Sequence, residues 1–139
     1  MNVLDYKNWS SGSGNSLNLT KVSEEVISHY NNNKRIFIGS DSFRSRKNIC
    51  FVTTVCLLTE RLGGRYFFYK EYVSPKKYST LATRITEEVR RSIELAEHFM
   101  ENHRVSPDMM ELHLDVSPFA AKEGTSRLSE MLKGYVQGY

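Results

Sequence analysis

The sequence predicts an α/β domain built around a mixed β-sheet. Three β-rich runs follow one another between residues 36 and 73, a segment with helical periodicity comes next, and a further β-rich run follows it. The chain of 139 residues has the size of one domain with a single core, and 40% hydrophobic residues are enough to build that core. We therefore expect a single domain over residues 1–139.

The N-terminal part predicts one short helix after an irregular segment. Residues 1–19 include the Ser- and Gly-rich stretch 10–16 and are expected to form a loop or arm. Thr20 is a suitable N-cap for a helix in which Val22, Val26 and Ile27 form an apolar stripe. The three asparagines that follow residue 30 indicate the end of this helix.

Three strands are predicted next, as an antiparallel meander. Residues 36–42 are a short β-rich run, the polar residues 44–48 are a turn, and residues 49–58 are the second strand. The pair Gly63-Gly64 separates the second strand from a third at 65–73.

A helix then returns the chain to the first strand. From Thr80 to about Asn102 the apolar residues recur every three or four positions, as in an amphipathic helix. Residues 109–116 predict a fourth strand, 125–133 a helix ended by Gly134, and 135–139 a short fifth strand. Because helical crossovers are overwhelmingly right-handed and join parallel strands, the first and fourth strands should be parallel neighbours.

The charge is unevenly distributed along the chain. Residues 31–91 contain 13 Lys and Arg against 5 Asp and Glu, whereas residues 92–139 contain 4 against 8. A basic middle suits a polyanion, and we expect nucleic acid, DNA or RNA, as the partner, although such segments are often only solvated surface. Arg44, Arg46 and Lys47 in the first turn are the candidate phosphate contacts.

The composition also points to a cellular compartment. The chain contains no stretch near the roughly 20 apolar residues of a membrane helix, and its N-terminus lacks a basic segment followed by an apolar one. Cys50 and Cys56 are too few for a disulfide framework and are not spaced as a redox or zinc motif. We expect a cytoplasmic protein with no membrane contact and with both thiols buried in a strand.

Three acidic residues are the candidates for chemistry. Asp41 comes near the end of the first predicted strand and Asp115 near the end of the fourth, so adjacent parallel strands would bring both to one sheet edge. On the crossover helix, Glu88 lies three positions after Ile85 and borders the stripe that faces the sheet, whereas Glu87 points largely away.

A cluster of these three carboxylates predicts a metal site. Carboxylates packed together repel one another unless protons or cations compensate them, and oxygen-only ligation favours Mg²⁺ or Mn²⁺ over Zn²⁺. Two such ions roughly 3.5–4 Å apart can activate a water and stabilise the leaving oxygen of a phosphodiester. The plainer interpretation is a strand-end acid satisfied by a turn at Asp41 and a solvated helix residue at Glu88.

The order of elements and acids resembles the ribonuclease H-like fold. Four segments more narrowly resemble the YkuK family of predicted ribonuclease H-related nucleases: Ile38-Gly39-Ser40-Asp41-Ser42, Leu81-x-x-Arg84-Ile85-x-x-Glu88, Leu112-His113-Leu114-Asp115-Val116 and Gly134-Tyr135-Val136-Gln137-Gly138-Tyr139. The resemblance implies a divalent-metal-dependent nuclease in which Asp41, Glu88 and Asp115 are the catalytic metal-binding acids. We add Arg84 of the second segment to the nucleic-acid contacts.

One departure from this family favours an alternative. Members usually continue past the fifth strand into a helical segment with another acidic residue and a His, whereas this chain ends at Tyr139, which predicts a C-terminally shortened site. His113 is on the same strand face as Asp115 and is the candidate replacement. The alternative function is a non-catalytic nucleic-acid- or protein-binding module with a degenerate metal site.

Two further groups of residues have both a functional and an ordinary interpretation. The aromatic residues of the third strand, Tyr66 to Tyr72, suit base stacking on alternate positions, but the commoner outcome is a core on one face and a covering on the other. His98 and His103 lack zinc-binding spacing and are expected on the surface, and His29 is expected to be exposed or to cap a helix as a cation.

Overall fold

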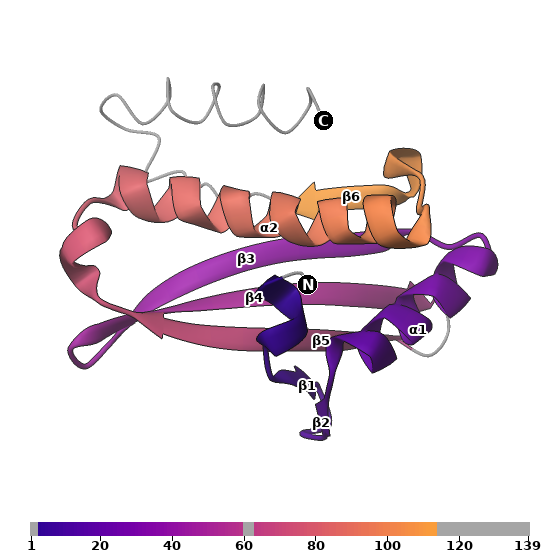
Figure 1. Cartoon of the computed structure of the whole chain (residues 1–139), viewed down its shortest axis with the longest axis horizontal. Helices are drawn as coiled ribbons and strands as arrows, with labels where there is room; N and C mark the ends of the chain where they lie inside the picture. The colour runs from indigo at the N-terminus through magenta and orange to yellow at the C-terminus, as the bar shows by residue number, and fades with distance from the viewer. Residues whose placement is uncertain (1–2, 60–62, 114–139) are drawn as a thin grey trace.

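The computed structural model describes residues 3–59 and 63–113 (Figure 1). The chain begins with a 3-10 helix η1 (Val3–Tyr6), strands β1 (Trp9–Ser11) and β2 (Ser16–Leu17), and helix α1 (Leu19–Asn31). Three long strands follow, namely β3 (Ile36–Ser45), β4 (Asn48–Thr59) and β5 (Gly63–Val73). The described part ends with η2 (Pro75–Lys77), helix α2 (Leu81–His103), η3 (Pro107–Met109) and strand β6 (Met110–His113).

These strands form one mixed sheet, which confirms the predicted fold class. Their order is β2-β1-β5-β4-β3-β6. The meander is antiparallel throughout, from Phe37–Cys56 and Asp41–Val52 to Val52–Lys70, and β6 joins β3 in parallel. The crossover through α2 returns the chain to the far edge of the meander, so the first and fourth predicted strands are parallel neighbours, as expected.

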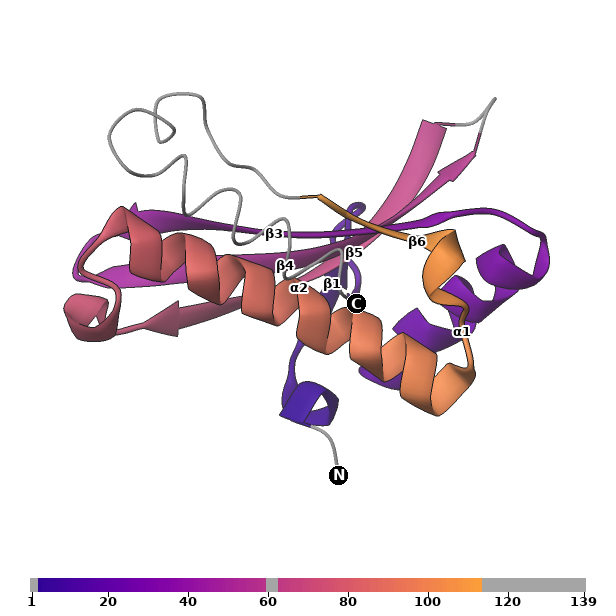
Figure 2. The ribbon, with the colours of Figure 1, turned by 90° about the horizontal axis from the view of Figure 1, so that it is seen from above.

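Both helices begin at side chains that satisfy free backbone N–H groups. The Asn18 side chain accepts a hydrogen bond from the Lys21 N–H, so α1 starts at Leu19 and its cap is not the expected Thr20. Thr80 and Thr83 form a capping box at the start of α2. Figure 2 shows α1 and α2 on the same side of the sheet.

The core lies between these two helices and the sheet. It is built from the apolar stripes of both helices and from alternate residues of the three long strands. Its fully or almost fully buried members include Trp9, Val22, Val26, Ile36, Ile38, Val55, Leu57, Tyr69, Leu95 and Phe99. Both cysteines are free thiols, Cys50 buried as expected and Cys56 half-buried.

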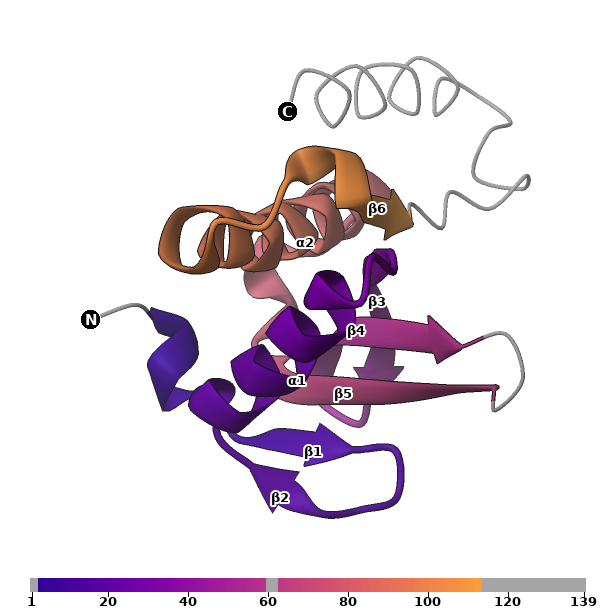
Figure 3. The same ribbon diagram turned by 90° about the vertical axis from the view of Figure 1, so that its right-hand side faces the viewer.

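Residues 1–19, expected to form a loop or arm, contain part of the sheet instead. Strand β1 pairs with β5 through Ser10–Phe68 and Ser11–Phe67, and Figure 3 shows the β1–β2 hairpin beside β5. The reason is Trp9, which is fully buried and packs edge-on against Tyr69 with ring centroids 4.8 Å apart. One large aromatic residue thus anchors a segment whose Ser and Gly content indicated no structure.

The predicted helix at 125–133 and strand at 135–139 lie outside the described residues. Within residues 3–59 and 63–113, no helix combines the length and apolar character needed to cross a membrane.

Candidate functional site

The candidate site centres on the pairing of β3 with β6. Cα partners run in parallel from Ile36–Met110 to Gly39–His113. The prediction that these two strands are adjacent is therefore confirmed. Asp115, the acid expected on the second of them, lies beyond His113 and outside the described residues.

Asp41 lies in the middle of β3 and not near its end. It is the sixth of ten residues, because β3 continues through Ser45 and turns into β4 with only Arg46 and Lys47 between the paired ends Ser45 and Asn48. The polar residues after Asp41 were expected to form a turn, but Arg46 allows a tight reversal by adopting a φ of 53°. Most of the polar run is thus strand.

The Asp41 side chain is exposed on the face of β3 that turns away from the helices. Its neighbours Ser40 and Ser42 are both buried on the helix-facing side, and side chains alternate along a strand. Asp41 Oδ1 accepts a hydrogen bond from the Ser42 N–H at 2.8 Å. Within the part of the chain that the structure describes, no ion pair compensates the Asp41 carboxylate.

Glu88 lies on the other face of β3, where Ser42 connects it to Arg84. The Ser42 hydroxyl donates to Glu88 Oε2 at 2.5 Å. Arg84 donates from Nε to Ser42 Oγ at 3.1 Å and from Nη2 to the Ser42 carbonyl at 2.8 Å. This contact agrees with the expectation that Glu88 faces the sheet. The residue that Glu88 contacts on β3 is Ser42, however, and not the expected Asp41.

Asp41 and Glu88 are therefore presented on opposite faces of the same strand. Among residues 3–59 and 63–113, no group of three His, Cys, Asp or Glu side chains is placed to hold a metal ion. The described residues thus do not by themselves complete the three-carboxylate cluster.

His113 shares the face of Asp41. It pairs with Gly39, two residues before Asp41, and its ring lies edge-on to Phe37 with centroids 5.4 Å apart. Its Nε2 is 3.8 Å from a carboxylate oxygen of Glu111, and the side chain is largely exposed. An imidazole and a carboxylate are therefore available on one face at the β3–β6 junction.

The basic residues gather at one end of the sheet. Arg44, Arg46 and Lys47 are exposed at the β3–β4 hairpin, and Figure 1 shows that hairpin at the same end as η2. Lys76 and Lys77 of η2, which no motif of the sequence singles out, are also exposed. Their position follows from the Ile49–Val73 pairing, which brings the start of β4 beside the end of β5.

A buried ionic network fixes α2 to the same end of the sheet. Arg91 donates to Glu71 Oε1 at 2.8 Å, lies 3.8 Å from Glu87 Oε1 and stacks over the Phe51 ring at 4.6 Å. Lys7 also binds Glu71. Burial raises the pKa of Glu71, but hydrogen bonds from Lys7 and Arg91 outweigh it and lower that pKa overall.

Glu87 belongs to this network, contrary to the expectation that it points away from the sheet. It is buried, accepts a hydrogen bond from the Tyr78 hydroxyl at 3.1 Å and is bound by Arg90. The physical reason is Arg91, four residues on, which gives the carboxylate a cation to pair with under η2. The spacing of four residues between Glu87 and Arg91 is the feature of the sequence that could have predicted this ion pair.

Two histidines are buried, His98, which was expected at the surface, and His29, which was expected to be exposed or to cap a helix as a cation. His98 accepts or donates hydrogen bonds with Ser23 and Asn102, and His29 Nε2 lies 3.1 Å from the Arg35 carbonyl oxygen. Burial lowers the pKa of both, and His103 adds to the lowering at His98. Each lies where a second element covers its helix, which a one-dimensional helical pattern does not reveal.

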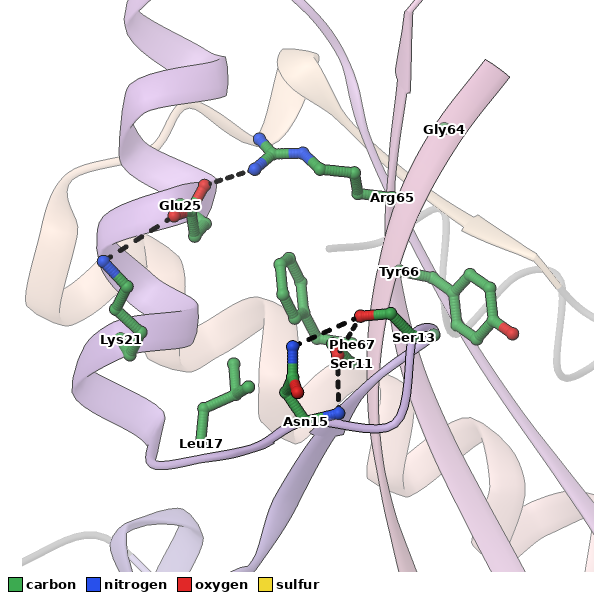
Figure 4. Close-up of a pocket in the computed structure, with 11 residues that line it drawn as sticks. Ser11, Ser13, Asn15, Leu17, Lys21, Glu25, Gly64, Arg65, Tyr66 and Phe67 are labelled. Atoms are coloured by element: carbon green, nitrogen blue, oxygen red, sulfur yellow. Dashed lines mark hydrogen bonds and ion pairs between the residues drawn. The ribbon is translucent and has the colours of Figure 1, made fainter. Parts of the chain in front are cut away.

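A pocket of about 380 Å³ lies at the opposite edge of the sheet, between the β1–β2 hairpin, α1 and β5 (Figure 4). Leu17 and Phe67 provide apolar walls. Its two cations are both paired, because Glu25 lies 2.6 Å from Arg65 and 3.8 Å from Lys21, and Lys21 also lies 3.6 Å from Glu24 outside the lining. The pocket therefore offers an anionic ligand no unpaired cation.

Comparison with known proteins identifies one family. The family model described as Ribonuclease H-like matches residues 18–139. Searches of curated proteins and of solved structures gave no match.

Proposed function

The chain belongs to the ribonuclease H-like family, and on this premise we propose that it is a divalent-metal-dependent nuclease that hydrolyses phosphodiester bonds of nucleic acid. Mg²⁺ or Mn²⁺ is the proposed cofactor, since the proposed ligands are carboxylates. More narrowly, the four sequence segments quoted above support a place in the YkuK group of this family. Two free thiols support a cytoplasmic location.

The observation that carries the proposal is the exposed Asp41 carboxylate beside a parallel strand. The pairing of β3 with β6 has a constant offset of 74 positions, from Ile36–Met110 to Gly39–His113. Asp41 follows Gly39 by two residues and therefore shares a face of the sheet with Gly39 and His113. We infer that Asp41 and Asp115, the acids of two of the segments quoted above, are partners in the metal site.

The donor set suits a hard cation. Asp41 presents a carboxylate that no described cation compensates, and Asp115 would add a second. When bound, the cation supplies Lewis-acid stabilisation of the phosphoryl oxygens and an activated water. His113 shares the face of Asp41 and is proposed as a further ligand beside it. Glu88 is hydrogen-bonded to Ser42 on the other face, so it can act as the third acid only if that hydrogen bond is broken.

The cationic end of the sheet supplies the proposed nucleic-acid contacts. Arg44, Arg46 and Lys47 project from the β3–β4 hairpin, within a few residues of Asp41 on the same strand. Arg84 is proposed in a supporting role, because its guanidinium is committed to Ser42. Phosphate contacts of this kind position a substrate without reading its sequence.

A cleavage assay tests the proposal. Purified protein is incubated with labelled single-stranded and duplex DNA and RNA in Mn²⁺, and Asp41→Asn is compared with Asp108→Asn, a matched change at an exposed acid of η3. We expect Asp41→Asn to reduce cleavage by at least 100-fold, in the range of other electrostatic catalytic groups of about 10²–10³. Cleavage that survives Asp41→Asn, or that persists in EDTA, would overturn the assignment.

A parallel pair of variants tests Glu88. Glu88→Gln keeps the hydrogen bond from Ser42 but removes the charge, and Glu101→Gln is the control at an exposed position of the same helix. A loss of cleavage in Glu88→Gln alone assigns the third metal-binding acid. Equal activity of both variants assigns Glu88 to the α2–β3 contact only.

The non-catalytic binding module is the second candidate function. It is favoured by the opposite faces of Asp41 and Glu88 and by the absence of a three-ligand group among the described residues. A ligand that binds only the folded state raises its stability, so thermal unfolding with and without Mn²⁺ separates the two functions. No shift with Mn²⁺, together with salt-sensitive nucleic-acid binding, would favour the module.

A further inference from the structure

The sheet has a face that neither described helix covers, which we call the open face. Its members alternate with the core residues along three strands: Phe37, Gly39, Asp41 and Phe43 of β3, Cys50, Val52, Thr54, Cys56 and Leu58 of β4, and Tyr66, Phe68, Lys70 and Tyr72 of β5. Of these, Cys50 is fully buried between Phe43 and Tyr72. Among residues 3–59 and 63–113, α1 and α2 both pack on the other face (Figure 2).

The open face exposes large apolar side chains. Five such residues are strongly exposed in the described part of the chain, and four of them lie here: Phe43, Leu58, Tyr66 and Tyr72. Exposed apolar groups gathered on one face mark a binding surface. The open face therefore has the apolar character of a binding surface rather than that of an ordinary polar surface.

The aromatic residues of β5 form a ladder along this face. Tyr66 and Phe68 are stacked with ring centroids 6.0 Å apart and planes inclined by 27°. Lys70 Nζ lies 5.9 Å from the Phe68 ring centre, and Tyr72, 56% exposed, follows two residues later. Figure 4 shows Tyr66 on the opposite side of β5 from Phe67, which lines the pocket beneath α1.

The last aromatic residue of the ladder, Tyr72, lies at the end of the sheet where the basic residues of the β3–β4 hairpin and η2 gather. Tyr72 pairs with Cys50, next to the β3–β4 hairpin, and η2 follows β5 directly. Five exposed cations surround this end: Arg44, Arg46, Lys47, Lys76 and Lys77. In residues 3–59 and 63–113 none of these five is ion-paired, so they form an uncompensated positive field.

We propose that the open face binds single-stranded nucleic acid, with bases stacked on the exposed rings of Tyr66 and Tyr72 and phosphates held by Lys70 and by the cations of the β3–β4 turn, Arg46 and Lys47. Aromatic rings along a positive track are what a single strand requires, because every unpaired base offers a flat face. Bases in a duplex are stacked on one another and cannot reach these rings. A protein partner without an acidic surface would leave the exposed cations without counter-charges, whereas every nucleotide of a single strand brings a phosphate.

The proposal rests on the proposed nuclease function and names its substrate class. Asp41 pairs with Val52, and Val52 pairs with Lys70, on three neighbouring strands. Two strand spacings therefore separate the Cα atoms of Asp41 and Lys70, a distance of about 10 Å across the open face. A strand seated on the β5 ladder therefore passes within reach of the proposed metal-binding acid. The tyrosines are substrate-positioning residues in this scheme and do not contact the reacting bond.

Binding is measured by fluorescence anisotropy in EDTA, so that cleavage cannot occur. The probes are a labelled 15-mer oligothymidine, a 15-mer oligouridine and a 15-base-pair DNA duplex, titrated with the full chain. Tyr72→Ala removes one stacking platform, and Leu81→Ala is the matched control, because Leu81 is 48% exposed on α2 and away from the open face. Thermal unfolding checks that both variants fold.

We expect the single strands to bind at least tenfold more tightly than the duplex. Tyr72→Ala should weaken single-strand binding about tenfold or more, as expected for one lost base stack. Leu81→Ala should stay within twofold of the parent, and Lys47→Ala should lower the slope of log affinity against log salt by about 0.7.

Three results would overturn the proposal. These are equal affinity for duplex and single strand, equal loss in Tyr72→Ala and Leu81→Ala, or a stable dimer in sedimentation analysis that Tyr72→Ala dissociates. Failure of the nuclease function gives a different pattern: single-strand binding in EDTA persists while Mn²⁺ supports no cleavage. The two proposals therefore fail separately.

Discussion

Ser42 on β3 donates its hydroxyl hydrogen to Glu88 Oε2 on α2 at 2.5 Å, and thereby determines where the acid of the crossover helix lies. The same hydroxyl oxygen accepts a hydrogen bond from Arg84 Nε at 3.1 Å. Ser42 therefore connects the Glu88 carboxylate and the Arg84 guanidinium, which lie one turn apart on α2. This contact holds Glu88 on the helix-facing side of β3, while the adjacent Asp41 is exposed on the other side.

Ser42→Ala should destabilise the protein by about 1–2 kcal/mol, because it removes the hydrogen bond from Ser42 to the half-buried Glu88 carboxylate and the hydroxyl that accepts from Arg84. Urea unfolding monitored by circular dichroism measures the change. Ser45→Ala, farther along the same strand, is the control and should change stability by less than about 0.5 kcal/mol. Equal stability of the two variants would show that the Ser42 contact contributes nothing.

Arg91→Met should be among the most destabilising single changes. Arg91 is almost fully buried between Glu71 and Glu87, and its removal leaves the half-buried Glu71 with Lys7 and the buried Glu87 with Arg90 and Tyr78. Because each carboxylate keeps a partner, we expect a cost near the lower end of the range of about 3–5 kcal/mol for a broken buried pair. Arg90→Met is the matched control, since Arg90 is 54% exposed and its pairs should contribute less than about 1 kcal/mol. Similar urea midpoints for the two variants would contradict a structural role of Arg91.

Gly12→Ala should disturb the β1–β2 hairpin. A Cβ at this position would lie 2.6 Å from Cε1 of Tyr66, so the ring must shift, and because this ring is 46% exposed we expect a cost of about 1 kcal/mol or less. In a Tyr66→Ala background the same change should cost much less. A double-mutant cycle by urea unfolding measures this coupling, and additive effects would show that the Tyr66 ring does not limit position 12.

Acid should weaken the fold through His98 and His29. Burial lowers the pKa of each below the ordinary value of 6.5, so near and below pH 6.5 the unfolded chain binds more protons than the folded one. Stability is then fully present above pH 6.5 and falls as the pH is lowered through that value. Urea midpoints between pH 7.5 and 5 test this, and His98→Gln should reduce the decline; an unchanged slope would rule out His98 as a source.

Much of the sheet was predictable from the sequence, because its signals are local. The β-rich runs at 36–42, 49–58 and 65–73 and the helical period after Thr80 predict the meander and the crossover, and the handedness rule predicts that β3 and β6 are neighbours. The N-terminal hairpin was missed because its formation depends on a distant contact, the packing of Trp9 on Tyr69.

The site was less predictable, because strand faces depend on register. Along β3, alternate residues face the helices, namely Ile36, Ile38, Ser40 and Ser42, and Asp41 faces away from them. This alternation is visible in the sequence, but it does not show where the strand ends. Glu87 and His98 were expected to point away from the core, and His29 to be exposed or to cap a helix, because a helical sequence pattern reveals only one apolar stripe. In the fold, η2, α1 and the sheet cover further sides of these helices.

Calorimetric titration of the full chain with Mn²⁺ tests the central claim, that Asp41 binds a divalent cation. We predict saturable Mn²⁺ binding by the parent protein and by Asp108→Asn, and at least tenfold weaker binding by Asp41→Asn with an unchanged or raised melting temperature, since the substitution removes a carboxylate that the described residues leave uncompensated. Equal Mn²⁺ affinity in all three proteins, or no binding by the parent, would contradict the account.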